Sequence, residues 1–97
     1  MTRAVSTSGD AAAGLTPADL LTVVTDVLAV VCGVTAVSVS AATELASIGA
    51  DSLARVELAE QVEERLTVYV PGLHIPDEDL AAFATVGDVR DYLAVRL

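Results

Sequence analysis

Aromatic residues and lysine are both scarce in this chain. Two tyrosines, one phenylalanine and no tryptophan make up 3% of the 97 residues. So few rings disfavour a β-sandwich core and a surface that stacks nucleic-acid bases. Lysine is absent, and five arginines face fourteen acids, which gives a formal net charge of −9. A surface this acidic repels nucleic acid and anionic membranes and suits partners with basic patches.

Cysteine occurs once, at Cys32, and this excludes an internal disulfide and is typical of a reducing compartment. We interpret Cys32 as a small buried side chain rather than a reactive thiol, because it ends an apolar segment. Residues 1–14 contain no signal-peptide core, and no run reaches the roughly 18 apolar residues that a membrane span needs. We therefore expect a cytoplasmic protein.

Hydrophobic residues are plentiful instead, at 54%, and alanine, valine and leucine supply most of them. A chain of 97 residues allows one small domain with a modest core. Residues 1–14 are rich in Ala, Ser, Thr and Gly, so we predict a disordered tail there and a folded domain over 15–97.

The first predicted helix begins at Thr16 as N-cap, with Pro17 and Asp19 in its first turn, and it ends at Gly33. Its apolar residues recur at helical spacing. This inner face comprises Leu20, Leu21, Val24, Val27, Leu28 and Val31.

Residues 34–47 are predicted to form a long loop. Val37 and Val39 alternate with serines as in a short strand, but no partner strand is evident elsewhere. We expect four apolar residues of this region to close over the core. They are Val37, Val39, Leu45 and Ile48.

A second helix is predicted over 52–66, which contains no glycine or proline. Leu58, Ala59, Val62 and Leu66 share one face of it. The opposite face carries two apolar residues, Leu53 and Val56, among four carboxylates. These are Glu57, Glu60, Glu63 and Glu64. Such a face is either a docking surface or a solvated charge run with two incidental apolar residues, and the residues alone do not decide between them.

Two further helices follow. Asp77-Glu78-Asp79 forms the acidic first turn of a short helix through Phe83, and Thr85 with Asp88 resembles a capping box for the last one. The inner face of that last helix comprises Val86, Val89, Leu93 and Leu97, with Tyr92 partly exposed. The fold class is therefore all-α.

The segment Gly49-Ala50-Asp51-Ser52-Leu53 stands where a loop becomes the second helix. Ser52 is placed there as the N-cap or the first helical residue, among free N–H groups and at the positive end of the helix dipole. A phosphate is favoured at such a position. A serine seen alone there is usually just a cap.

With Leu45-x-x-Ile48 before it and an acidic helix after it, this segment resembles the modification site of acyl carrier proteins. The resemblance implies a four-helix bundle with three longer helices, a short third helix and a long loop after the first. It implies that Ser52 carries 4′-phosphopantetheine taken from coenzyme A, and that Asp51 assists the modification by positioning the metal or the hydroxyl.

The resemblance also implies a non-catalytic, monomeric carrier that holds acyl groups as thioesters. Its partners would be a phosphopantetheinyl transferase and an acyltransferase, ketosynthase or other biosynthetic enzyme, with no nucleic acid and no membrane. Members of the family dock their enzymes through the second helix. The resemblance therefore favours a docking surface over a solvated charge run for the exposed apolar and acidic residues of this helix. Arg55 departs from the smaller residue usual in the family. We expect its head to snorkel into solvent, with a contact to the phosphate or the cargo as the other reading.

The pathway is less determined. The lack of lysine indicates a GC-rich genome, and Ala54 replaces the acid that fatty-acid members often carry after Asp-Ser-Leu. Both favour polyketide or antibiotic biosynthesis over housekeeping fatty acid biosynthesis. A peptidyl or aminoacyl carrier and an unmodified interaction module remain alternatives.

A hydrolase with Ser52 as nucleophile is disfavoured, because a serine nucleophile needs a base and His74 is the only imidazole. We read His74 as an exposed loop residue. It lies within residues 72–76, which form an insertion relative to the family pattern. We predict that this insertion lies at the mouth of the bundle on the cargo side and reshapes the pocket or an enzyme contact.

Overall fold

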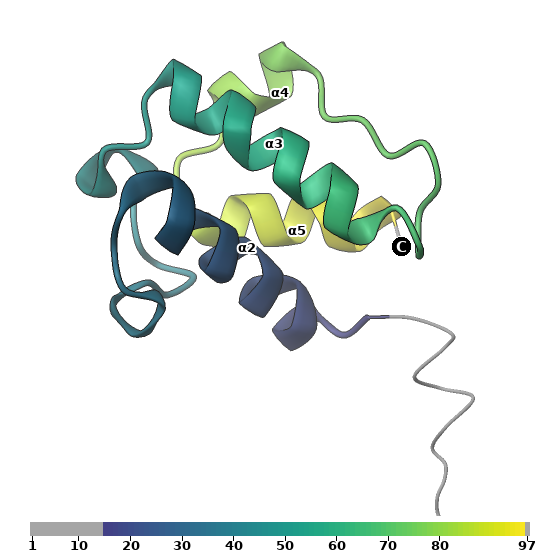
Figure 1. Ribbon diagram of the computed structural model, residues 1–97, viewed down its shortest axis with the longest axis horizontal. Helices are drawn as coiled ribbons and strands as arrows, with labels where there is room; N and C mark the ends of the chain where they lie inside the picture. Colours follow the sequence, from purple (N-terminus) through teal and green to yellow (C-terminus); the bar gives the residue numbers. More distant parts are fainter. Residues whose placement is uncertain (1–14, 97) are drawn as a thin grey trace, which may run out of the picture.

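The computed structural model describes residues 15–96, which form a helical bundle (Figure 1). Its helices are α2 (Pro17–Cys32), α3 (Ser52–Leu66), α4 (Asp77–Ala82) and α5 (Val86–Arg96), with short 3₁₀ turns η1 (Ala36–Ser38) and η2 (Leu45–Ile48). Helix α2 packs against both α3 and α5, and the short α4 packs against α3. The predicted all-α fold, with three longer helices, a short third helix and a long loop after the first, is confirmed.

Helix α2 begins and ends as its sequence predicts. The Thr16 hydroxyl accepts a hydrogen bond of 3.1 Å from the Asp19 N–H, and the Asp19 carboxylate accepts one of 3.0 Å from the Thr16 N–H. Gly33 ends the helix with φ 69°, a left-handed conformation in which glycine carries no Cβ penalty. The side chains of Leu20, Val24, Val27 and Leu28 are buried, while Leu21 and Val31 are partly buried at the edge of the core.

The core collects the predicted inner faces of the helices. Within residues 15–96 the side chains with less than 2% exposure are Leu20, Leu28, Leu45, Leu58, Leu66, Leu93, Val24, Val27, Val62, Val86 and Val89. Burial of apolar area of this kind is the main favourable contribution to folding. Leu97 and the predicted disordered tail over 1–14 lie outside the described residues.

The loop between α2 and α3 closes over the core only in part. Val39 and Leu45 are buried and Ile48 is half-buried, but Val37 is 96% exposed, so its predicted place in the core is wrong. Val37 lies inside the η1 turn, which is held by its own bonds such as Val39 N–H to the Ala36 carbonyl at 3.1 Å. None of the three residues of this turn is buried, so the turn as a whole lies at the surface.

This loop is tied to the start of α5. Glu44 and Thr85 form an isolated antiparallel bridge, and the Gly87 N–H donates to the Ala41 carbonyl at 2.8 Å. A Cβ on residue 87 would stand 3.0 Å from that carbonyl oxygen, so glycine permits this close approach. The attachment fixes the far end of the loop, from which α3 begins.

The segment between α3 and α4 lies elsewhere than expected. In Figure 1 it leaves the C-terminal end of α3 and runs back along that helix to α4. Ile75 is buried, and Pro76 precedes the first turn of α4. Residues 72–76 do not line the cavity beside Ser52, so the prediction that the insertion shapes this pocket is wrong, whereas its predicted contact with an enzyme stays a prediction. No helix among residues 15–96 is long and apolar enough to cross a membrane.

Candidate functional site

The start of α3 is built by two local devices. Gly49 ends the η2 turn in a left-handed conformation with φ 80°, and the Ala50 N–H returns to the Leu45 carbonyl at 3.0 Å. Ala50 is 5% exposed and anchors the loop to the core. Asp51 is the N-cap, because its carboxylate accepts from the Ala54 N–H at 2.9 Å. Of the two positions predicted for Ser52, the structure shows the first helical residue.

Ser52 is exposed, and its hydroxyl makes no hydrogen bond to any residue in the part of the chain described here. The N–H groups of Ser52 and Leu53 also have no protein acceptor within residues 15–96. They point out of a helix end that carries partial positive charge. A phosphodiester attached at this hydroxyl would therefore meet free donors and a favourable field, so the residues present fit such a group.

A cavity of about 280 Å³ lies beside Ser52, between α3 and α4. Its walls are residues from those two helices alone: Ser52, Arg55, Val56, Asp77, Leu80 and Ala81. Each of the two helices contributes both apolar and charged side chains to it. A group attached to Ser52 could therefore contact the walls of this cavity.

Arg55 does not snorkel into solvent as predicted. Its Nε–H donates to the Ala50 carbonyl at 3.1 Å, and its Nη1 donates to the carbonyls of Leu80 and Phe83, both at 2.7 Å. The last two carbonyls lie at the C-terminal end of α4, where the Leu80 carbonyl also accepts from the Phe83 N–H at 3.4 Å. The guanidinium thus joins the start of α3 to the end of α4 and is half-buried there.

The exposed face of α3 agrees with the predicted pattern except at one residue. Leu53 is 69% and Val56 is 38% exposed, and Glu57, Glu60 and Glu64 are exposed beside them. Two apolar side chains among carboxylates form a surface that a partner with apolar and basic groups would complement.

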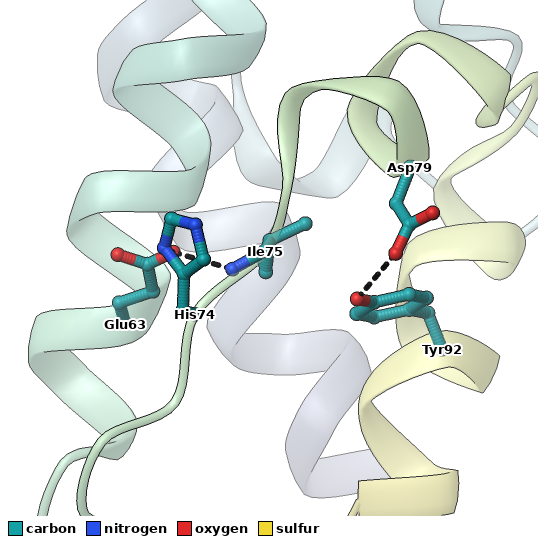
Figure 2. A network of polar contacts seen from close by, with 5 residues as sticks. All are labelled: Glu63, His74, Ile75, Asp79 and Tyr92. Atoms are coloured by element: carbon teal, nitrogen blue, oxygen red, sulfur yellow. Dashed lines mark hydrogen bonds and ion pairs between the residues drawn. The ribbon is translucent and has the colours of Figure 1, made fainter.

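Glu63 is the exception, because its carboxylate contacts other residues of the chain. Its Oε2 accepts a hydrogen bond of 2.7 Å from the Ile75 N–H and lies 3.6 Å from Nδ1 of His74 (Figure 2). The Glu63 side chain is 23% exposed, against 76% for His74. Glu63 therefore fastens the α3–α4 segment to α3, and its assignment to a free acidic face is corrected.

A second polar contact was not predicted from the sequence. The Tyr92 hydroxyl donates a hydrogen bond of 2.7 Å to Asp79 Oδ2, which ties α5 to α4 (Figure 2). Phe83 packs edge-on against the Tyr92 ring at 5.2 Å, and the Arg96 guanidinium lies 3.4 Å from the centre of that ring. Burial, followed by the bond to Asp79, raises the pKa of Tyr92 above its usual 10.0. No local motif marks this pair, since its members are joined only by the packing of two helices.

The capping box at α5 is confirmed. The Asp88 carboxylate accepts from the N–H groups of Ala84 at 2.9 Å and Thr85 at 3.0 Å, and the Thr85 hydroxyl accepts from the Asp88 N–H. These bonds from the Ala84 and Thr85 N–H groups lower the pKa of Asp88 below 3.8, because they stabilise the charged form.

The other candidate nucleophiles and bases are poorly placed for catalysis. His74 sits against Glu63, about three turns and roughly 16 Å along α3 from Ser52, so no serine–histidine pair forms. Cys32 is half-buried, and its pKa is raised, first by burial and then by the charges of Asp51 and Glu57. Its thiol is thus kept protonated. Among residues 15–96, no group of three or more His, Cys, Asp or Glu side chains gathers to hold a metal ion.

Comparison with known proteins places this geometry in context. Residues 22–93 match the family model described as "Phosphopantetheine attachment site". No solved structure matches the chain significantly.

Two curated relatives show the range of similarity. The chain is 51% identical to the meromycolate extension acyl carrier protein of Mycobacterium leprae over 43 residues, which are 44% of this chain and 33% of that protein. It is 47% identical to an acyl carrier protein of Clostridium perfringens over 51 residues, or 53% of this chain and 60% of that protein. The matched segments therefore span between a third and three fifths of these relatives.

Proposed function

Because the chain belongs to the acyl carrier protein family, whose members bear a phosphopantetheine attachment site, we propose that Ser52 is the attachment residue. The observation that carries this proposal is the exposed Ser52 hydroxyl beside two free N–H groups at the start of α3. The carrier domain would comprise residues 15–97. The protein would hold acyl groups as thioesters and would catalyse no reaction itself.

The chain's own contribution to the modification is to present a nucleophile. The Ser52 oxygen would form a bond to the phosphorus that bears the pantetheine part of coenzyme A. The P–O bond within the pyrophosphate would break, the nucleotide bisphosphate would leave, and the hydroxyl proton would pass to the transferase. Asp51 orients Ser52 by capping α3, and its free carboxylate oxygen would be available to the metal of that enzyme. Once attached, the arm supplies a thiol for thioester chemistry.

The partners would be a phosphopantetheinyl transferase and enzymes that load, extend or release acyl groups. We infer that they dock on the surface formed by Leu53, Val56, Glu57, Glu60 and Glu64, which we call the α3 docking surface. Its carboxylates are solvent-exposed, so they steer basic partners while adding little net affinity. Weak contacts of this kind suit a carrier that must leave each enzyme quickly.

Two pathway classes are supported by different observations. The absence of lysine and the presence of Ala54 favour polyketide or related secondary metabolism. The likeness to meromycolate extension carriers favours a fatty-acid type of extension instead. The mass of the cargo on protein purified from its native host would distinguish the two.

The attachment is tested by incubating the chain with coenzyme A, Mg²⁺ and a broad-specificity phosphopantetheinyl transferase, then measuring intact mass. We expect a gain of one phosphopantetheinyl group that is lost in Ser52→Ala. The matched control is Ser47→Ala, an exposed serine just ahead of α3 that should load like the wild type. No gain on the wild-type chain would instead favour an unmodified interaction module, and a gain on Ser52→Ala would contradict the assignment.

A further inference from the structure

Arg55 stands out among the residues that line the cavity beside Ser52, because it also bonds backbone groups just before α3 and at the end of α4. Arg55 lines the cavity, and its guanidinium also bonds the Ala50, Leu80 and Phe83 carbonyls. One turn further along the same face of α3, Leu58 and Ala59 are already in the core, at 1% and 4% exposure. The guanidinium therefore stands between the cavity and the apolar interior of the bundle.

A long alkyl chain attached at Ser52 would have to pass this group to reach the interior between α3 and α4. Doing so would break hydrogen bonds from a charged donor, which are stronger than neutral ones, and would leave a half-buried charge without partners. Beyond it lie buried apolar side chains such as Leu58 and Val62, which an alkyl chain would contact once past the guanidinium. Entry is therefore unfavourable as long as the guanidinium keeps its carbonyl partners.

The cavity that remains suits a small group with oxygen atoms. At about 280 Å³ it lies just below the range of typical ligand pockets, which begins at roughly 300 Å³. Val56, Leu80 and Ala81 provide apolar wall. Arg55 also lines the cavity, and its Nη2 amino group has no protein acceptor within residues 15–96, which leaves one donor of this side chain for an oxygen of the cargo.

We propose that Arg55 is a specificity-determining residue that excludes long alkyl chains from the bundle interior and binds the oxygen of a short keto- or hydroxyacyl group. The inference rests on the proposed attachment at Ser52. It assigns the cargo class from this chain's own residues.

The test uses the full chain loaded at Ser52 with four arms: free phosphopantetheine, butyryl, acetoacetyl and octanoyl. Intact mass first verifies each load, and backbone and arginine side-chain NMR shifts then report where the cargo lies. Butyryl and acetoacetyl match in length and differ in one keto group. We expect acetoacetyl, but not butyryl, to shift the Arg55 guanidinium signals. Octanoyl should shift only residues around the cavity, such as Val56 and Ala81.

Arg55→Met keeps an unbranched apolar side chain at this position and removes the guanidinium group. In this variant octanoyl should shift the amides of Leu58 and Val62 and raise the melting temperature, while in the wild type it should do neither. Arg65→Met, an exposed arginine on the same helix, is the matched control and should behave as wild type. If Arg55→Met does not fold, the same NMR shifts are measured on Arg55→Lys and compared with those of the wild type.

Octanoyl that shifts Leu58 and Val62 in the wild type would overturn the exclusion. Equal effects of butyryl and acetoacetyl on the Arg55 signals would overturn the oxygen contact. A wild-type chain that gains no mass would instead refute the attachment at Ser52, and the two failures are therefore distinguishable.

Discussion

Tyr92 on α5 donates a 2.7 Å hydrogen bond to the carboxylate of Asp79 on α4 (Figure 2). Helix α4 has only six residues, and Asp77, Leu80 and Ala81 in it form a wall of the cavity beside Ser52. This bond and the Arg55 contacts hold that wall in place from two sides.

Tyr92→Phe should lower the free energy of unfolding by about 1 kcal/mol, because it removes one partly exposed hydrogen bond to a charged group. That loss corresponds to roughly 4–8 °C in the melting temperature of a domain of this size. Tyr69→Phe is the control, since Tyr69 is 45% exposed and its hydroxyl bonds no residue within 15–96. Equal melting temperatures for the two variants would show that the Asp79 bond adds nothing.

Glu63→Ala should destabilise the fold by about 1–3 kcal/mol, because it leaves the part-buried Ile75 N–H without its acceptor. Urea unfolding measures the change. Glu64→Ala, next in the chain and exposed, removes the same charge without a hydrogen bond and should cost far less. A free Glu63 on the docking surface would instead make the two variants alike in stability and alike in partner binding.

Asp51 caps α3 and is proposed to assist the modification of Ser52, and two substitutions separate these roles. Asp51→Ala should cost about 1 kcal/mol of stability, because the cap on the Ala54 N–H is lost, whereas Asp51→Asn keeps a capping oxygen and should stay near wild type. If the carboxylate also assists the modification, Asp51→Asn should load phosphopantetheine more slowly despite its stability. The loading rate of the stable Asn variant decides the point, and a wild-type rate would reduce Asp51 to a cap.

Asp88 makes stability depend on pH at the acidic end. Its pKa is lowered in the folded chain by the N–H bonds from Ala84 and Thr85, so the folded state favours the charged form. Its stabilising effect is therefore complete above the unfolded pKa near 3.8 and is lost as the pH falls through the lower folded pKa. An NMR titration of the Asp88 carboxyl carbon should give a midpoint below 3.8. The stability gap to Asp88→Asn should close over the same interval, and a midpoint at or above 3.8 would contradict the cap.

The α3 docking surface should act mainly on association. Glu57→Gln, Glu60→Gln and Glu64→Gln together should lower kcat/KM for loading by a phosphopantetheinyl transferase by about tenfold at low salt. Raising the salt should bring the wild type down toward the variant, because exposed charges are screened.

A triple variant elsewhere provides the control for net charge. Asp26→Asn, Glu44→Gln and Asp91→Asn remove the same charge from exposed positions outside α3 and should have a much smaller effect. A loading rate that does not change with salt, or equal losses in both triple variants, would exclude local steering by α3.

The sequence by itself determined the helices and the candidate attachment residue. Capping residues and helical spacing act over a few neighbouring positions, so Thr16, Gly33 and Asp88 could be assigned from local chemistry. Local chemistry placed Ser52 only at a helix start, and the resemblance to acyl carrier proteins made it the candidate attachment residue. The extent of α3 and its buried face followed from the same periodicity.

Only the tertiary structure decided where Arg55, Glu63, Tyr92 and Val37 would point. Arg55 and Tyr92 contact residues far away in the chain, and Glu63 found its partner in a loop whose path no local pattern specified. Side-chain direction in such cases depends on which backbone groups another helix leaves unpaired, and that is known only once the helices are packed.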